Sequence, residues 1–510
     1  MAEEDPNPPR QALLVVAALC TIALGLALSH LIAAPLLEDE GWYLAVSRLA
    51  VGGALPYVDM AYTQGPTLPW IYGLPQWIAP GLLTGRLTSL LFAAATVGLS
   101  LYAAWRLAGV RGLVVCASCL GLNPYAWSFL VLTKTYALAS AFLALALALM
   151  AHPERGDARL RWWVGAGVAL ALGVGTRLSL APAAVMAVAC LALARRWREG
   201  AAVTGGGLVT GALLFGPFLA LDASATVENL VGYHARIGAS LPEAIVRANR
   251  LHGLKVFVMS WAPSLVLIAA GVVAAGRSRW AEVVALVQER PARLVAVVGP
   301  ASVAAAQLTP SHPQPEYQVV VTGGLAVAAG VASLGAADVA WRQVAVAAVA
   351  VSALGLMVND GPRWSVEGGA LPLEKAAELA EVVQRAVPPG EPVLTLRTFA
   401  AVEANRPVPG GMEMGVFGCF PEQSEEEARR FHRINDAILL DMARSGRYHA
   451  VVFGEVEWTL NAYMIPLPPQ VAQARRGAFL QALQRHYEPT TQVRGVGQWG
   501  ETVQVYTRKP

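Results

Sequence analysis

The chain has 510 residues, of which 55% are hydrophobic and only 14% are charged, and its mean hydropathy is +0.48. A soluble protein would carry about a quarter charged residues, so this composition excludes an ordinary soluble globular protein and indicates an integral membrane protein. The formal net charge of +3 is small and dispersed along the chain, and we therefore expect no nucleic-acid partner.

The first apolar stretch, Ala12 to Ala34, is long enough to cross a bilayer. No basic region precedes it and no A-x-A cleavage site follows it, which predicts a retained helix rather than a signal peptide. Pro35 ends the stretch, and three acids come directly afterwards: Glu38, Asp39 and Glu40. Charge beside hydrocarbon is costly, so acids at such a position usually have a function.

We expect Asp39 to be the N-cap of a short helix from about Glu40 to Val51. Trp42 and Tyr43 would lie along the membrane surface while Asp39 faces a cavity at the water boundary. The alternative is a capped interfacial helix with no chemical role.

Ten further apolar segments follow, and they raise the number of candidate spans to eleven: Leu83 to Leu107, Leu113 to Leu122, Phe129 to Met150, Trp163 to Val174, Leu178 to Ala194, Val203 to Leu221, Val256 to Ala275, Leu294 to Leu308, Val319 to Leu334 and Val344 to Val358. The short loops rich in arginine all fall on one side if the N-terminus is cytoplasmic, which is the positive-inside pattern. Thr67 to Leu83 is also apolar, but it contains three prolines, and counting it as a span would invert every later basic loop. We interpret it as a juxtamembrane or re-entrant segment on the outer face.

The remainder, from about Asn359 to Pro510, holds about half of all Asp and Glu residues and reads as a soluble α/β domain outside the cytoplasm. The patterns predict these elements: helices at Leu373 to Val387, Ser424 to Ser445 and Gln470 to His486, and strands at Pro392 to Leu396, His449 to Phe453 and Thr502 to Thr507. No phosphate-binding, nucleophile or zinc motif occurs in it, so it is assigned no chemistry of its own. The predicted division is therefore a membrane domain, residues 1–358, with a catalytic first outer loop, 35–82, and an extracytoplasmic domain, 359–510.

Several cations are predicted on the same face as the acids. Arg86, Lys134 and Arg177 each stand near the outer end of an apolar segment, and an outer loop adds His234 and Arg236. Each long cation alone could be an interface anchor that reaches out to water. Gathered on one face, they favour a pocket for an anionic group.

Several motifs, in this order, resemble the GT-C superfamily of integral-membrane glycosyltransferases, in the branch that includes protein O-mannosyltransferases and the lipid A aminoarabinose transferase. They are Asp39-Glu40-x-x-Tyr43, the stretch Tyr62 to Trp70, the helix start Gly85 to Leu90, Val231-Gly232-Tyr233-His234 and Glu316-Tyr317. The resemblance covers about Ala12 to Leu334. Two departures stand out: Gln64 replaces a lysine of the aminoarabinose transferases, and Lys134-Thr135 replaces a second aspartate of many members.

The resemblance implies a polytopic helical membrane protein of about eleven spans with outer juxtamembrane helices and a C-terminal soluble α/β domain. It also implies a polyprenyl-phosphate sugar donor, a lipid, glycan or protein acceptor, and a site on the extracytoplasmic side of the cytoplasmic membrane. Inverting transfer needs a base and a cationic environment for the departing phosphate. We assign Asp39 as the base with Glu40 beside it, and the donor-binding residues as Tyr43, Tyr62, Gln64, Arg86, Lys134, Arg177, His234, Arg236 and Tyr317.

No metal-ligand set with credible spacing is present in the sequence, although an acid pair beside a phosphodiester would accept a divalent ion. The rival interpretation is a transporter or a flippase or ligase for lipid-linked oligosaccharides, since charge within a membrane also marks transport pathways. We find no internal repeat with broken helices in corresponding halves, which many transporters show.

Overall fold

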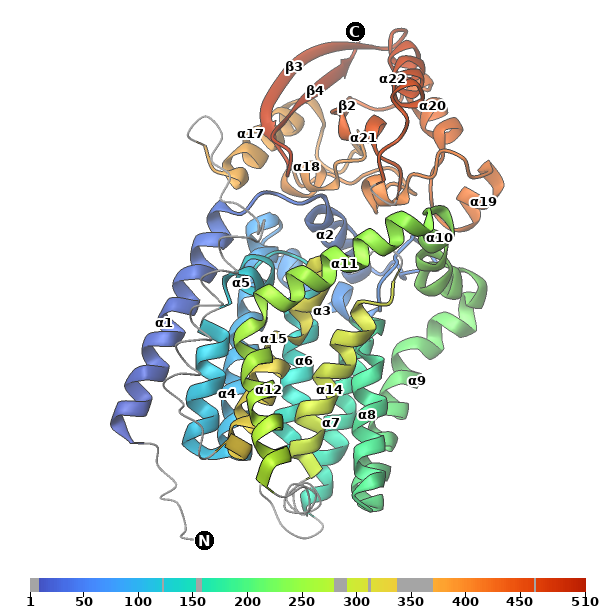
Figure 1. Ribbon diagram of the computed structural model, residues 1–510. Coiled ribbons are helices and arrows are strands. Elements are labelled where there is room, and N and C mark those ends of the chain that lie inside the picture. Colours follow the sequence, from blue (N-terminus) through green and yellow to red (C-terminus); the bar gives the residue numbers. More distant parts are fainter. Residues whose placement is uncertain are drawn as a thin grey trace.

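The computed structural model describes residues 9–121, 123–152, 158–278, 291–310, 313–336, 370–462 and 465–510. Figure 1 shows two layers: a bundle of long helices in the lower part of the view, and a smaller α/β region, residues 370–510, that covers the upper end of the bundle. Helices of intermediate position lie between the two.

The segment predicted from Phe129 to Met150 is not one helix, because one helix ends at Leu130 and the next, bent by 110° from it, begins at Thr135. The helices of the bundle otherwise largely fall in the predicted apolar segments. They are α1 (Arg10–Ala33), α4 (Leu82–Gly121), α5 (Pro124–Leu130), α6 (Thr135–Met150), α7 (Ala158–Val174), α8 (Ala181–Leu193), α9 (Trp197–Val227), α12 (Ala262–Ser278), α14 (Pro291–Gln307) and α15 (Thr322–Ala332). The predicted eleventh segment, 344–358, and the predicted domain boundary at 358/359 lie outside the described residues. Within the described residues, three helical stretches are long and apolar enough to cross a membrane, or up to five if each of two bent helix pairs forms one span. The number of eleven spans therefore stays a prediction.

One break inside α4 separates two of the predicted segments. Ala108 and Gly109 leave helical geometry, and Gly109 has a φ of 65°, a conformation that glycine adopts without strain. The Nε of Arg293 donates to the carbonyl of Leu107 across 2.8 Å, and Arg111 donates to the carbonyl of Ser333. These bonds tie the break to the ends of α14 and α15 and define a basic lower end of the bundle.

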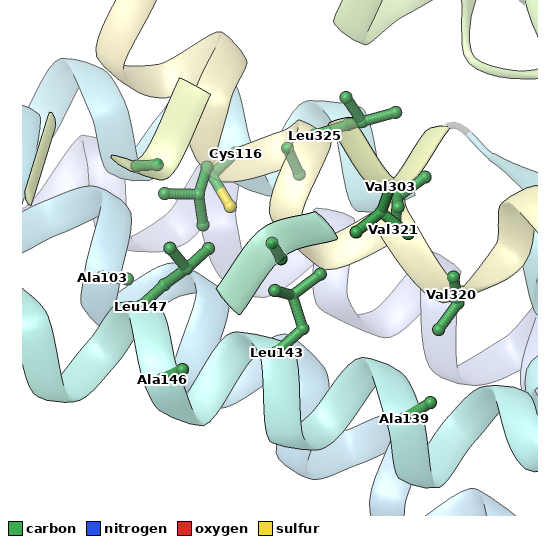
Figure 2. Close-up of a cluster of buried hydrophobic side chains, with 14 of the residues drawn as sticks. Ala103, Cys116, Ala139, Leu143, Ala146, Leu147, Val303, Val320, Val321 and Leu325 are labelled. Atoms are coloured by element: carbon green, nitrogen blue, oxygen red, sulfur yellow. The ribbon is translucent and has the colours of Figure 1, made fainter. Parts of the chain in front are cut away.

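The core of the bundle is built from small and branched aliphatic side chains. Figure 2 shows Leu143 and Leu147 of α6 facing Cys116 of α4 and Leu325 of α15 within one cluster. Small residues let helix backbones approach closely, which is how helices associate in lipid without a hydrophobic driving force. Cys116 and Cys119 are free and buried in this core, as two small apolar residues would be.

Four helices lie between the bundle and the α/β region: α2 (Glu38–Val51), α3 (Thr67–Ile78), α10 (Tyr233–Ser240) and α11 (Glu243–Ser260). Helix α3 has 12 residues, and at about 1.5 Å per residue it is too short for a hydrocarbon core of about 30 Å. It packs against α2 and α4 and exposes Trp77 and Ile78. This agrees with the interpretation of Thr67 to Leu83 as a segment that does not span.

The α/β region contains a four-stranded sheet in the order β1-β2-β4-β3, formed by β1 (Leu394–Thr395), β2 (Ala450–Phe453), β3 (Tyr487–Val496) and β4 (Glu501–Arg508). Strand β1 pairs parallel with β2, and the other pairs are antiparallel. Its helices are α17 (Pro372–Ala386), α18 (Thr398–Glu403), α19 (Glu425–Arg430), α20 (Asp436–Arg444), α21 (Val456–Thr459) and α22 (Pro469–Leu483).

Two features of this region differ from the expectation. Strand β3 was not predicted, and the single helix expected at Ser424 to Ser445 is two helices, α19 and α20. His432 between them has a φ of 56°, and the side chain of Asn435 caps α20 by accepting from Ile438 N across 2.9 Å. Because Asn435 caps the start of α20, a new helix begins there, although the amphipathic pattern runs on without a break.

One apolar cluster joins the bundle end to the α/β region. It contains Leu36 and Leu44 from the first part of the chain together with Phe399 and Val452 from the last. A side chain at Gly41 of α2 would overlap the backbone nitrogen of Phe399, so α2 and α18 are in direct backbone contact. The α/β region therefore holds α2, and the acids at its start, in a fixed position.

Candidate active site

A cavity of about 750 Å³ lies between the upper end of the bundle and the α/β region. Its lining residues come from many separate segments: Pro35, Leu37, Glu38, Asp39, Trp42, Tyr43, Thr63, Gln64, Phe129, Lys134, Tyr136, Arg177, Tyr233, His234, Gln314, Glu316, Tyr317, Phe417, Val456, Thr459, Leu460, Gln498 and Trp499. A volume of this size suits a small molecule with several polar contacts. Of the eleven predicted site residues, seven line this cavity: Asp39, Tyr43, Gln64, Lys134, Arg177, His234 and Tyr317.

Asp39 lies at the start of α2 with its carboxylate facing the cavity. The helix begins at Glu38 after the N-cap Leu37, so the expectation that Asp39 is the N-cap was wrong. Glu40 does the capping, because its Oε1 accepts from the backbone nitrogen of Leu37 across 3.3 Å. The Oδ1 of Asp39 accepts from Trp42 Nε1 across 3.2 Å, and its side chain keeps 24% of its surface exposed.

Lys134 is held between two acids. Its Nζ lies 2.8 Å from Asp39 Oδ2 and 3.4 Å from Glu316 Oε1. It directly precedes the first residue of α6. The rings of Phe129 and Tyr136 lie beneath it at 5.6 and 5.4 Å. Lysine alone at a membrane boundary would extend to water, but here it is 5% exposed and fixed at the cavity.

Arg177 is the second cation of the cavity, and it has no ion-pair partner among the described residues. Its Nη1 donates to Thr135 Oγ1 across 3.1 Å, while its Nε has no hydrogen-bond partner in the described part of the chain. The guanidinium lies 4.4 Å from the ring centre of Tyr317 and 5.1 Å from that of Tyr136. A buried guanidinium with unused donors is a site for a phosphate or carboxylate.

Glu40 and Arg86 are corrected from site residues to a structural pair. Arg86 Nη2 lies 2.7 Å from Glu40 Oε1, and its Nε lies 2.8 Å from Oε2. The remaining donors of Arg86 reach the carbonyls of Leu31, Ala34 and Pro35. Both side chains are 0% exposed, so neither can contact a substrate in the cavity.

Tyr62 and Arg236 are also placed away from the cavity. Tyr62 is fully buried among aromatic rings, at 5.6 Å from the centre of Trp42 and 6.0 Å from that of Tyr57. Arg236 pairs with Glu228 and, at 2.8 Å, with Glu427 of α19. Its charge is used to hold the α/β region, and the prediction that it binds donor phosphate is corrected accordingly.

His234 lines the cavity and forms a hydrogen bond to the protein backbone. Its Nε2 donates to the carbonyl of Thr63 across 2.9 Å. Because a carbonyl only accepts, this nitrogen carries the proton, and the bond ties the end of α9 and α10 to the stretch that contains Gln64.

The structure adds site residues that the sequence did not indicate. Glu316 was noted only as a neighbour of Tyr317, yet it pairs with Lys134. Glu38 contacts Arg397, which also lies 2.7 Å from Glu457 and 2.6 Å from Glu501. An arginine in a soluble domain gives no local signal of such a role; only its burial, 0% exposed, reveals it. Within the described residues, no group of three or more His, Cys, Asp or Glu side chains is arranged to hold a metal ion.

The helical bundle, the acidic start of α2 and the α/β region above them together form a fold that is similar to those of two solved structures. Comparison with solved structures finds ArnT from Cupriavidus metallidurans, in a structure bound to undecaprenyl phosphate, at a TM-score of 0.63 and 18% identity over 96% of this chain and 97% of that one. The oligosaccharyltransferase of Archaeoglobus fulgidus, tethered to an acceptor peptide with the NVT sequon, gives a TM-score of 0.51 at 12% identity over 94% of this chain and 72% of that one.

No protein-family model and no curated protein matches the chain. At identities below a fifth the likeness to solved structures establishes the fold, and it confirms at that level the resemblance that the motifs indicate.

Proposed function

We propose that this protein transfers a sugar from a polyprenyl-phosphate donor to a hydroxyl of an acceptor within the cavity. The observation that carries the proposal is the presence, in one cavity, of a carboxylate, Asp39, and a buried guanidinium, Arg177, that has no carboxylate partner in the described part of the chain. Base and anion site are the two groups that inverting transfer from a phosphate leaving group requires. The bound undecaprenyl phosphate of the similar ArnT structure supports a lipid of this class.

In the proposed step, Asp39 accepts the proton of the acceptor hydroxyl as its oxygen attacks the anomeric carbon. A new carbon–oxygen bond forms on one face of the sugar while the bond to the phosphate oxygen breaks on the other, and configuration inverts. The bonding electrons leave with the polyprenyl phosphate, whose pKa is low enough that no general acid is needed. Asp39 then releases its proton to water.

The cations divide this work between them. Lys134 already pairs with both Asp39 and Glu316, and it keeps Asp39 oriented, with the 2.8 Å contact fixing one oxygen. Arg177 has donors left for the phosphate, and the two rings packed on it hold its plane in place. Charges and donors that the protein holds in fixed positions stabilise a developing anion without having to reorient during the reaction.

The sidedness that we propose follows from the two ends of the bundle. The arginine-rich breaks lie at the end opposite the cavity, as the contacts of Arg111 and Arg293 show. With basic loops inside, the cavity and the α/β region face the outside of the cytoplasmic membrane, where a lipid, glycan or protein acceptor is reached.

The test uses purified protein, a labelled short-chain polyprenyl-phosphate sugar and an extract of the native membranes as acceptor source. We expect release of polyprenyl phosphate in step with a glycosylated product. Asp39→Asn should lower the transfer rate about 10²- to 10⁴-fold, because the amide keeps the shape but cannot take the proton, while donor binding is kept. Arg177→Gln should weaken donor binding itself. Transfer that survives Asp39→Asn would contradict the assigned base, and wild-type protein that neither binds nor cleaves any such donor would contradict the function.

A further inference from the structure

We call the part of the cavity that the membrane part of the chain lines its floor, and the part that the α/β region lines its roof. Every Asp, Glu, Lys and Arg residue of the described lining belongs to the membrane part of the chain: Glu38, Asp39, Lys134, Arg177 and Glu316. The described lining residues of the α/β region carry no charge at all: Phe417, Val456, Thr459, Leu460, Gln498 and Trp499. A phosphate belongs with the floor, and a neutral, hydroxyl-rich ring with one apolar face belongs with the roof.

Trp499 is the largest element of this roof, and it keeps 45% of its surface exposed although it lines a cavity. It stands in the turn between β3 and β4, Gly497 to Gly500, where Gly500 N donates to Gly497 O across 3.3 Å. Gly497 and Gly500 have φ values of 78° and 61°, so the turn requires glycine at both ends. This turn chemistry fixes Gln498 and Trp499 at its tip.

The turn is anchored to the base of the site rather than free. Glu501, the first residue of β4, lies 2.6 Å from Arg397 and also accepts from the backbone of Glu455 and Val456. A Cβ atom built on Gly497 would lie 3.3 Å from Arg397 Nη1 and 3.5 Å from Glu38 Oε1. Glu38 is the residue before Asp39. The tip is thus held beside the catalytic end of α2, and an exposed aromatic ring held rigidly is preorganised to bind a ligand.

We infer that the roof is a sugar-binding subsite in which the indole of Trp499 stacks on the neutral ring of the donor glycosyl group while the floor holds its phosphate. The inference rests on the proposed function. The C–H groups on one face of a sugar carry partial positive charge and pack on the negative face of an aromatic ring. Gln498, beside Trp499, offers an amide donor and acceptor to the ring hydroxyls. The α/β region then selects the sugar, and the bundle supplies the base and the phosphate site.

The experiment compares binding of two kinds of probe to purified protein by calorimetry: farnesyl phosphate, which has no sugar, and farnesyl phosphate carrying glucose, mannose, galactose, N-acetylglucosamine or arabinose. For wild type we expect at least one glycosylated probe to bind about tenfold or more tightly than bare farnesyl phosphate. Trp499→Ala should remove this advantage and leave the affinity for bare farnesyl phosphate unchanged. Trp499→Phe should restore part of it, because a smaller ring still stacks.

The matched control is Trp197→Ala, an exposed tryptophan at the first residue of α9, far from the cavity, which should keep the full advantage. Thermal unfolding of Trp499→Ala at the wild-type temperature shows that the fold is intact. The inference is overturned if no sugar improves binding to wild type, or if Trp499→Ala keeps the improvement. An equal loss for both probes would also overturn it, since it would make Trp499 only an interface anchor. Failure of wild type to bind bare farnesyl phosphate would instead contradict the proposed function.

Discussion

Asp39 and Glu40 are neighbours of the same type, and the structure gives them opposite surroundings. Successive residues on a helix point about 100° apart, so one turns to the cavity and the other into the protein. Asp39 is partly exposed beside Lys134, whereas Glu40 is sealed against Arg86. Which of the two acids faces the cavity depends on where α2 begins, and a shift of two residues from the expected start decides it.

The Glu40–Arg86 pair leads to a prediction about stability rather than chemistry. Glu40→Gln leaves a buried guanidinium without its charge partner, and we expect it to lower the free energy of unfolding by about 3–5 kcal/mol. The double variant Glu40→Gln with Arg86→Met should recover much of this loss, because no uncompensated charge remains. Unfolding in mixed detergent micelles measures both. A single variant as stable as wild type would show that the pair is dispensable.

At the scale of elements, α2, α18 and α21 meet at one arginine, which pairs with three acids. Arg397 contacts Glu38, Glu457 and Glu501, and one positive charge cannot balance three negative ones. Burial raises the pKa of Glu38 from its ordinary value of 4.5 to about 8. The positive charge of Arg397 opposes this rise, and the negative charges of nearby acids add to it. Burial likewise raises the pKa of Glu457.

This junction predicts a pH dependence of stability. Because the folded-state pKa of Glu38 lies above the unfolded one, the folded protein binds more protons in between, and the stabilisation is fully present below about pH 4.5 and lost as the pH rises through 8. The unfolding temperature should fall from pH 6 to pH 9, and Glu38→Gln should flatten this fall. The control Glu425→Gln, which removes an exposed acid of α19, should follow the wild-type curve. Identical curves for Glu38→Gln and wild type would refute the role of Glu38.

The end of α9 shows why the helix predicted at Ser424 to Ser445 is interrupted. A π-helical turn, Glu228–Gly232, presents Glu228 to two arginines of different exposure. Arg433, from the break between α19 and α20, is buried, lies 3.0 Å from Glu228 and donates to Asn229 across 3.1 Å. Arg236 holds the same acid from the outside.

These two arginines form a matched pair of variants. Arg433→Met should lower the free energy of unfolding by about 1.5–3 kcal/mol, since it removes charged hydrogen bonds at a buried position. Arg236→Met should change it by less than about 1 kcal/mol, because its side chain is 38% exposed and the pair is screened by water. Arg236→Met should also keep the wild-type affinity for farnesyl phosphate. Reduced affinity in that variant would restore Arg236 as a donor ligand.

At the scale of the whole molecule, the prediction concerns the two sides of the membrane. Cysteines placed at Glu374 in α17 and at Arg196 before α9, in a chain without its native cysteines, should react with a membrane-impermeant maleimide from opposite sides. Intact cells should label only the Glu374 position, and inverted vesicles only the Arg196 position. Labelling of both positions from one side would contradict the sidedness.

The sequence was sufficient for the parts of the fold that local patterns encode. Apolar length located the bundle helices, and the turn and alternation signals of the last part located most helices and strands of the α/β region, because these features depend on near neighbours. Asp39, Lys134 and Arg177 stood out because charge beside apolar segments is costly.

The remaining site features depend on partners far along the chain, which no local pattern shows. Glu40 and Arg86 are 46 residues apart, and Glu38 and Arg397 are 359 apart. A motif identifies Arg86 as a charge at a helix start, but only folding shows that Glu40 already neutralises it. Trp499 gave no signal, since one tryptophan in a glycine turn is ordinary until the turn is seen over a cavity.

Gln498 and Trp499 of the roof come from the turn between β3 and β4, and this bears on how the protein is made. A nascent chain is produced from its N-terminus, so Asp39, Lys134 and Arg177 enter the membrane long before the turn at Gly497 to Gly500 exists. Until β4 pairs with β2 and β3, the turn that carries Gln498 and Trp499 is not in place at the cavity. Under the proposed function and the inferred subsite, an unfinished molecule already has the base and the phosphate site but lacks the stacking ring, so selection of the sugar is the last property that the protein acquires.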